Sequence, residues 1–184
     1  MNSAQLEAFL DLFEKWNRSI NLSGATTRGE LKEHVDDCLH VVPLLETVAP
    51  VGVLAKVLDV GSGGGFPVVI AAICAPTIEF VSLEPVHKKH AFLRTAAREL
   101  SLENLECLAE RLEDHEHHDY DAAMSRATFD IREWLTNAER FVRPAGRVIG
   151  FEGQLRADLV DVERISYVLA GKPRAIVSRI KRST

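Results

Sequence analysis

The sequence places an aspartate and four glycines in one short stretch, VLDVGSGGGFP, at residues 57–67. Asp59 is followed at alternate positions by Gly61, Gly63 and Gly65. A turn alone needs one or two glycines, whereas several bare positions let a ligand approach backbone N–H groups closely. The stretch therefore predicts a ligand-binding loop between a buried strand and a helix.

The spacing of these glycines separates classes of ligand. The dinucleotide fingerprint G-x-G-x-x-G would require its third glycine at Phe66, which is aromatic. The pattern D-x-G-x-G-x-G instead suits S-adenosylmethionine, whose cationic amino-acid end could face Asp59 directly or through water. The alternative interpretation is that Asp59 only caps a turn.

A second acid follows where a cofactor site would need one. The next apolar run, IEFVSLE, ends at Glu84, close to the position where such folds place the acid that binds ribose hydroxyls. Glu84 also has a purely structural alternative. Together with Asp59 and the loop, it predicts a site for S-adenosylmethionine.

Other reactive side chains form weaker patterns. The histidine-rich segment at residues 115–121, HEHHDYD, lacks a second ligand cluster and is interpreted as a solvated loop. Cys38, Cys74 and Cys107 are odd in number and follow no paired spacing, so neither a disulfide framework nor a zinc site is predicted. We expect no metal.

The elements that must position these residues alternate along the chain from Lys56. Strands are predicted at KVLDV, IEFVSLE, LECLAE, YDAAMSRA and GRVIGFEG, with helices at FPVVIAAIC, HKKHAFLRTAAREL and from about Ile131 to Phe141. This alternation predicts an α/β, Rossmann-like fold with a mostly parallel sheet that binds ligands at the carboxyl ends of its strands. The region after Leu155 looks helical, and ISYVLAGKPRAIVSRIK predicts a C-terminal antiparallel hairpin at the sheet edge.

A helical preface precedes this core. Apolar residues at helical spacing predict a first helix capped by Ser3. After the loop NRSINLSGAT, Thr27 and Glu30 form a capping-box pattern that opens a second helix through roughly Leu45. Pro50 and Gly52 then end the preface.

Length and composition set the broad class. The chain has 184 residues, of which 46% are hydrophobic and 27% charged, as in ordinary globular proteins. We expect one domain over residues 1–184, with the preface at 1–50 and the Rossmann-like core at 51–184. The longest apolar stretch, FPVVIAAICAP, is too short to span a bilayer, and the acidic start is not a secretory signal. A cytoplasmic protein without a membrane partner is predicted.

The charge distribution leaves nucleic acid open as a partner. A net charge of −5 argues mildly against RNA binding. However, basic residues gather in HKKHAFLRTAAR and from Gly171 to Thr184, so local patches could meet a phosphate backbone.

Seven stretches give the chain a more specific resemblance. They are, in order, WNRSINLSG, HVDDCL, LDVGSGGGFPVVIAA, LEPVHKKHAFLR, LENLECLAERLED, YDAAMSRA and FEGQ. In these the chain resembles the bacterial small-subunit (16S) ribosomal RNA guanine-N7 methyltransferase family, also called glucose-inhibited division protein B. The resemblance implies a class I fold that uses S-adenosylmethionine to methylate N7 of a guanine, acting as a monomer on small-subunit ribosomal RNA or the 30S particle.

The resemblance also implies roles for single residues. The positions that match the family's cofactor site are Gly61, Gly63, Phe66, Glu84 at the ribose, and Leu112 and Glu113 at the adenine. Arg126 of SRA matches the arginine at the cofactor and target base, and it is the candidate catalytic residue; the alternative is that it only pairs with an acid such as Asp121. Basic positions that suit RNA contact are Lys88, Lys89 and Arg111. Asn21, His34 and Asp37 match residues that link the preface to the site.

One residue departs from the family pattern, and two other functions would fit most of the same sequence features. Many relatives have a lysine where this chain has Glu152, which weakens any role of that position in steering RNA. A class I methyltransferase acting on a small molecule or protein, or a non-catalytic RNA- or cofactor-binding module of the same fold, would share most of these features.

The chemistry of the predicted reaction asks little of the side chains. Guanine N7 carries no proton, so its methylation would need no general base.

Overall fold

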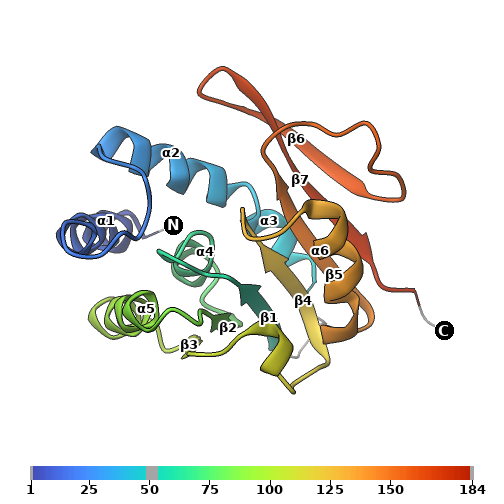
Figure 1. The fold of residues 1–184 in the computed structure, drawn as a ribbon, viewed down its shortest axis with the longest axis horizontal. Helices are drawn as coiled ribbons and strands as arrows, with labels where there is room; N and C mark the ends of the chain where they lie inside the picture. The colour runs from blue at the N-terminus through green and yellow to red at the C-terminus, as the bar shows by residue number, and fades with distance from the viewer. Residues whose placement is uncertain (1, 49–53, 183–184) are drawn as a thin grey trace.

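The computed structural model describes residues 2–48 and 54–182 (Figure 1). Within them a seven-stranded sheet has the order β3-β2-β1-β4-β5-β7-β6. The strands are β1 Ala55–Val60, β2 Ile78–Leu83, β3 Leu105–Leu108, β4 Tyr120–Ser125, β5 Val142–Glu152, β6 Glu163–Leu169 and β7 Lys172–Ile180. β1 to β5 pair in parallel, whereas β7 is antiparallel to both β5 and β6. The predicted α/β, Rossmann-like fold is confirmed.

Helices cover both faces of the sheet (Figure 1). α4 (Val68–Cys74) and α5 (His87–Glu99) lie on one face, and α6 (Ile131–Asn137) with the 3-10 turn η2 (Ala138–Phe141) lies on the other. Successive residues of a strand point to opposite faces of the sheet. Val57 of β1 therefore belongs to the hydrophobic cluster that includes residues of α4 and α5, and Leu58 belongs to the cluster that includes residues of α6 and η2.

The preface consists of α1 (Ser3–Asn17), α2 (Arg28–Leu39) and α3 (Val42–Glu46). The capping box of α2 is confirmed, since Thr27 Oγ1 accepts from the Glu30 N–H and Glu30 Oε2 accepts from the Thr27 N–H. α1 is capped by Asn2 and not by Ser3. The predicted second helix is interrupted after Leu39, and α3 begins with proline in its first turn, where the missing N–H is tolerated.

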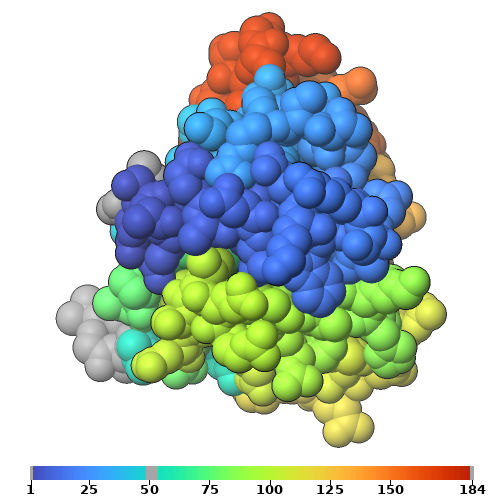
Figure 2. Space-filling view, turned by 90° about the vertical axis from the view of Figure 1, so that its left-hand side faces the viewer, coloured from blue at the N-terminus to red at the C-terminus, as the bar shows by residue number. Residues whose placement is uncertain are grey.

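The preface packs on the core beside the glycine loop. α1 lies across the molecule between α2 and α5 (Figure 2). Phe9 and Phe13 of α1 pack their rings on Phe66, with centroids 5.3 and 5.4 Å apart, and Phe13 also meets Phe92 of α5. The predicted boundary at Pro50 and Gly52 lies outside the described residues.

The C-terminal hairpin is confirmed as an addition at the sheet edge. Its turn is Ala170-Gly171, with φ of 47° and 73°, which is the two-residue geometry that matches the twist of paired strands. The helix predicted after Leu155 is wrong. That segment is irregular, and two ion pairs tie it to the start of α6: Arg156 with Asp130, and Asp158 with Arg132.

No helix within residues 2–48 and 54–182 has both the length and the apolar character needed to cross a bilayer.

Candidate functional site

A cavity of about 410 Å³ opens at the carboxyl ends of β1, β2 and β4. We call it the loop cavity, because the glycine loop forms much of its lining. The predicted site residues that line it are His34, Gly61, Gly63, Phe66, Glu84, Lys89 and Arg126. Parallel sheets of this class bind ligands at this edge, so the sequence pattern and the geometry agree on the location.

The four glycines of the loop are bare for different reasons. A Cβ on Gly61 would collide with the Thr128 side chain, and one on Gly64 would lie 2.5 Å from Cε2 of Phe13. Only at Gly63, with φ of +54°, would a Cβ have no neighbour closer than 3.7 Å. Close packing of the protein therefore accounts for most of the glycines, and Gly63 is the one that leaves open space for a ligand.

Gly65 lies outside the loop-cavity lining. A Cβ at this position would lie 2.6 Å from Cγ2 of Val69 in α4. The residue thus allows the loop to pack on the helix that follows it. Its predicted contact with a cofactor stays a prediction.

Glu84 holds the loop and the start of α5 together. Its Oε2 accepts from the Gly63 N–H and its Oε1 accepts from the Val86 N–H, both at 2.8 Å. A carboxylate has about four lone-pair sites, so each oxygen keeps acceptor capacity that can face the cavity. Acceptors at this place suit the hydroxyls of a ribose.

Asp59 is a buried residue near the end of β1, and it is not among the residues that line the loop cavity. It is 1% exposed, and neither of its carboxylate oxygens has a hydrogen-bond partner within the described part of the chain. Burial, assisted by the negative charge of Glu84, raises the pKa of Asp59 to about 7. An unpaired buried carboxylate is costly, so a cationic group brought near Asp59 would be stabilised. The turn-cap alternative does not account for it, since the Ser62 hydroxyl donates to the Asp59 backbone carbonyl instead.

Arg126 follows β4 and is held by two residues of α2. Its Nε donates to Asp37 Oδ2 at 2.8 Å, and its Nη2 donates to His34 Nδ1 at 2.9 Å. Burial and the adjacent guanidinium lower the pKa of His34, which favours the neutral ring that can accept this bond. The sequence-predicted link between the preface and the site is therefore a direct hydrogen-bonded contact.

Arg126 does pair with an acid, as the alternative interpretation expected, but the acid is Asp37 and not Asp121. Asp121 accepts from Arg143 Nε and from the Lys56 backbone N–H, both at 2.7 Å. These bonds lie at the opposite end of β4 from Arg126, so they fix the start of the strand and leave Arg126 to α2.

A second cavity, of about 360 Å³, lies on the other side of Arg126. We call it the hairpin cavity, because Tyr167, Leu169 and Arg174 of the C-terminal hairpin line it. His34, Arg126 and Ala127 line both cavities. Arg126 thus stands in a wall that the loop cavity shares with the hairpin cavity.

Leu112 and Glu113 are placed elsewhere. They lie in the 3-10 turn η1 (Leu112–Asp114) after β3 and line a separate cavity of about 260 Å³ with Phe129 and Trp134. The segment after β4 accounts for the separation, since Thr128 lies against Gly61. The structure therefore brings these two residues near the site but not into the loop cavity.

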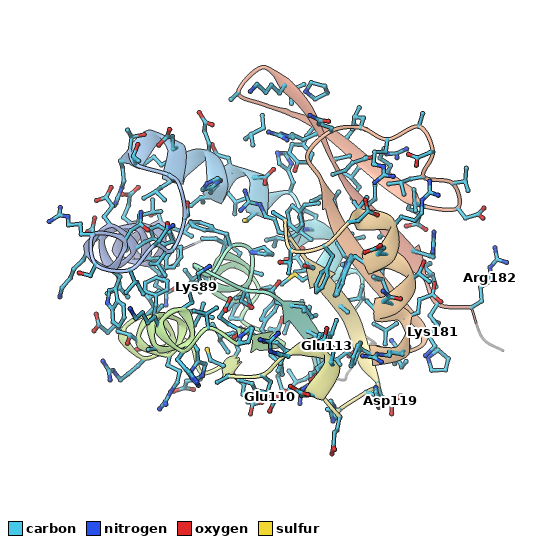
Figure 3. All side chains as sticks on the ribbon, viewed as in Figure 1. Lys89, Glu110, Glu113, Asp119, Lys181 and Arg182 are labelled. Carbon is cyan, nitrogen blue, oxygen red and sulfur yellow. The ribbon has the colours of Figure 1, made fainter. Side chains whose placement is uncertain are left out.

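The predicted basic residues differ in position. Lys89 lines the loop cavity, whereas Lys88 and Arg111 are exposed. Figure 3 shows Lys89 near the start of α5, well apart from Glu113. Lys88 and Lys89 lie in the first turn of α5, where cations oppose the helix dipole, so a ligand phosphate would relieve this cost.

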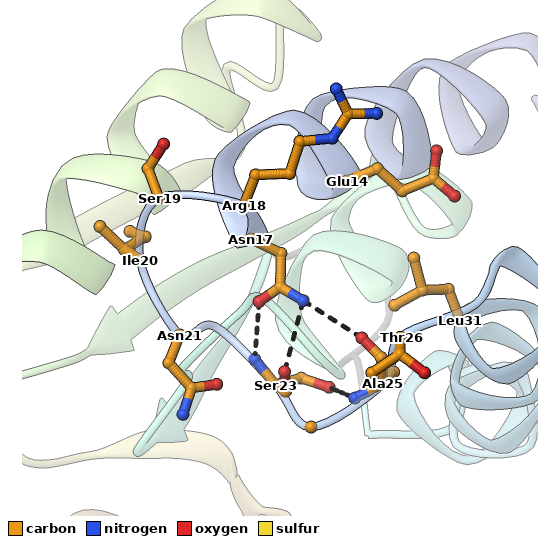
Figure 4. A pocket seen from close by; sticks show the side chains of 11 residues that line it. Glu14, Asn17, Arg18, Ser19, Ile20, Asn21, Ser23, Ala25, Thr26 and Leu31 are labelled. Carbon is orange, nitrogen blue, oxygen red and sulfur yellow. Dashed lines mark hydrogen bonds between the residues drawn. The ribbon is translucent and has the colours of Figure 1, made fainter.

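Asn17 is a residue that the sequence reasoning missed. Its Oδ1 accepts from the Leu22 N–H group. The same oxygen accepts from the Ser23 N–H group, and Asn17 Nδ2 donates to the carbonyls of Ser23 and Ala25 (Figure 4). This amide fixes the loop whose residues Leu22 and Ser23 line the loop cavity. Asn21, the predicted linking residue, is exposed and lines a different cavity, of about 750 Å³. The sequence signal that points to Asn17 is the Trp16-Asn17 pair at the end of α1.

Glu152 has a structural role in this chain. It is 3% exposed and accepts from Arg164 Nε at 2.9 Å. The Glu152 carboxylate is therefore neutralised by Arg164, a neighbouring arginine of β6. The histidine-rich segment is likewise only partly solvated, because His115 is buried between Glu110 and the Tyr120 hydroxyl.

Comparison with known proteins is consistent with this geometry. A family model described as "GidB: rRNA small subunit methyltransferase G" matches residues 2–183. A protein named ribosomal RNA small subunit methyltransferase G from Geobacter sp. (strain M21) is 36% identical over 168 residues, which cover 88% of this chain and 75% of that protein. The protein of the same name from Bordetella avium is 34% identical over 158 residues, covering 85% and 70%.

A solved methyltransferase structure has a similar fold. The apo form of the S-adenosylmethionine-dependent methyltransferase SibL matches with a TM-score of 0.60 and 18% identity, over 79% of this chain and 57% of that one. At this identity the likeness concerns the fold alone. From the match to the family model and from relatives of this similarity, we conclude that this chain belongs to the rRNA small subunit methyltransferase G family.

Proposed function

We propose that this protein transfers a methyl group from S-adenosylmethionine to N7 of a guanine in small-subunit (16S) ribosomal RNA. Family membership supports the cofactor and the class of RNA. The observation that carries the proposal is Arg126, which is hydrogen-bonded to Asp37 and His34 and lines two cavities at once, one of them formed by the glycine loop and Glu84. A transferase needs such an arrangement, because its donor and acceptor must meet from two sides.

The residues of the loop cavity fit the cofactor. S-adenosylmethionine, when bound, supplies a methyl group on a positively charged sulfur. Asp59 would balance the charge of the amino-acid end, Gly63 would leave space for it, and Glu84 would accept from the ribose hydroxyls. We assign Phe66 to the same cavity, Gly61 and Gly65 to the shape of the loop, and Leu112 and Glu113 to the adenine.

The acceptor side needs orientation more than proton transfer. Guanine N7 has a free lone pair, so the chain has no proton to remove before the new bond forms. Two of the five guanidinium N–H groups of Arg126 are used by Asp37 and His34. The remaining donors can bind guanine O6 and leave N7 free to attack, which makes Arg126 the catalytic residue of the proposal.

The remaining expectations complete the proposal. Lys88, Lys89 and Arg111 would contact RNA phosphates around the cavity. Residues 1–184 would act as a single domain and as a monomer in the cytoplasm, without a metal, on the 30S particle or its RNA. The contact of the preface with Phe66 and Arg126 supports one unit, because the site is incomplete without α2.

The test offers methyl-labelled S-adenosylmethionine to unmodified small-subunit particles, to protein-free small-subunit RNA and to a control without RNA. The labelled base is then identified after digestion to nucleosides. Label in 7-methylguanosine from small-subunit RNA is the expected result. Label that enters only a small molecule or a protein would favour the first rival, and cofactor binding without any transfer would favour the non-catalytic module.

A further inference from the structure

The C-terminal hairpin reaches the site through one hydroxyl group. Tyr167 of β6 donates from its hydroxyl to Asp37 Oδ1 at 2.6 Å. The other oxygen of the same carboxylate, Oδ2, accepts from Arg126 Nε at 2.8 Å. Asp37 therefore bridges the hairpin and the arginine, and the three residues come from segments far apart in the chain.

The bridge is held from both ends. The Tyr167 ring stacks on His40 of the preface, with centroids 3.8 Å apart and planes inclined by 22°. The Asp37 side chain is only 10% exposed, so its two bonds are poorly accessible to competing water. Burial and the neighbouring carboxylate raise the pKa of Tyr167, which keeps the hydroxyl protonated as a donor.

The bridge also determines which face of Arg126 remains free. Nε and one N–H of Nη2 point to α2, and within the described residues Nη1 has no hydrogen-bonding partner. A carboxylate with a second, fixed donor has one preferred direction, whereas a lone carboxylate can rotate about its terminal torsion. The direction of Asp37 in turn sets the plane of the guanidinium, whose donors form a rigid fork.

We propose that Tyr167 is a positioning residue, which acts through Asp37 to orient Arg126 toward the acceptor base. This inference rests on the proposed function, in which Arg126 binds the target guanine. It adds the C-terminal hairpin to the catalytic machinery. Tyr167 does not touch the base or the cofactor in this account.

The test compares two tyrosines in the full-length chain. Tyr167→Phe keeps the ring on His40 and removes the hydroxyl. Tyr120→Phe is the matched control, because it removes the only other tyrosine hydroxyl of the chain, one that is bonded to His115. We expect kcat for methyl transfer to fall about tenfold in Y167F, which corresponds to about 1.4 kcal/mol. In Y120F kcat should stay within about twofold of wild type, although the melting temperature falls.

A double-mutant cycle identifies the route of the effect. If Tyr167 acts through Arg126, R126A/Y167F should transfer as slowly as R126A alone, within about twofold. The proposal would be overturned if Y167F lowered kcat by the same factor in the wild-type background and in the R126A background. It would also be overturned if kcat were unchanged in Y167F. Tyr167→Leu, which removes the same hydroxyl and leaves the Asp37–Arg126 pair in place, takes the place of Y167F in the cycle if that variant does not fold.

A measurement without turnover separates this inference from the proposed function. In protein with ¹⁵N-labelled arginine, the Nε–H signal of Arg126 is assigned by its loss in R126A. We expect its hydrogen exchange to speed up about tenfold in Y167F and to stay unchanged in Y120F. Wild-type protein without transfer activity would refute the proposed function, but the exchange result would still decide whether Tyr167 positions Arg126.

Discussion

The two sides of the loop cavity are built from different kinds of sequence. The floor consists of the glycine loop and Glu84, with the buried Asp59 two residues before the loop, and comes from two adjacent strand ends and the turn between β1 and α4. The wall around Arg126 joins α2, the segment after β4 and the C-terminal hairpin, with partners 89 and 130 residues apart. The floor is a local motif, whereas the wall exists only when distant parts of the chain are packed together.

This difference has a functional consequence. Damage to the floor should remove cofactor binding, because its residues surround the space that the cofactor would fill. Damage to the wall should leave cofactor binding largely intact and remove transfer, because its residues orient the acceptor. If this division holds, a substitution can damage one side and leave the other working.

The largest effect is expected from Gly63→Asp in the floor. The new carboxylate would occupy the one open position of the loop and add a negative charge beside Glu84, so the Kd for S-adenosylmethionine should rise at least about 100-fold. Calorimetry measures this directly. Gly171→Asp is the matched control, since Gly171 also has a positive φ, of 73°, and no atom lies within 4 Å of a Cβ built there. Normal cofactor binding by G63D would show that the floor is placed wrongly.

A large effect on a different quantity is expected from Arg126→Ala in the wall. Transfer should slow by about 100- to 1000-fold, as when a positioned donor is removed from an active site. The variant also leaves Asp37 buried without its cation, so thermal unfolding must be measured alongside transfer. Arg126→Lys keeps a charge beside Asp37 and should recover stability without recovering the rate. A rate that recovers together with stability would make Arg126 a structural residue.

The same division explains what could be predicted from the sequence. The strands, the loop and Glu84 follow from local apolar runs and glycine spacing, and all lie where the pattern puts them. The roles of Asn17 and Tyr167 depend on partners that no local pattern reveals. The glycine count itself was misleading, because Phe13, Val69 and Thr128 explain three of the four positions. The prediction of a helix after Leu155 was wrong because that segment, too, depends on distant partners: Arg156 forms an ion pair with Asp130 at the start of α6.

A smaller, pH-dependent effect is expected from Asp59→Asn. If the ionised carboxylate balances the cofactor's cation, affinity should rise with pH up to about 7 and then level off, because burial raises the pKa of Asp59 to about 7. The change should approach about tenfold per pH unit below that value. Calorimetry from pH 5.5 to 7.5 measures it, and D59N should lose the slope. A slope that persists in D59N would assign the titration to another group.

The same raised pKa predicts the stability of the cofactor-free protein. The folded state holds the Asp59 proton to a higher pH than the unfolded state, whose carboxyl titrates near 3.8. Unfolding free energy should therefore fall between about pH 4 and 7 in wild type relative to D59N, and stay level above that. Melting curves over this range without cofactor provide the check.

The smallest effects are expected at Lys88 and Lys89 in the first turn of α5, which would meet RNA phosphates beside the loop cavity; Lys88 is exposed, whereas Lys89 lines the cavity. Replacing either lysine with alanine should weaken RNA binding a few-fold and lower the slope of log affinity against log salt by about 0.7, the value for one phosphate contact on a single strand. Cofactor affinity should not change in K88A. Lys32→Ala is the matched control, because Lys32 is an exposed lysine that faces Glu7 on α1. If K32A lowers the salt slope as much as K88A and K89A do, then RNA responds to net charge and not to the start of α5. If only the two α5 variants lower it, the RNA backbone passes the mouth of the loop cavity, and a base flipped from it can reach Arg126.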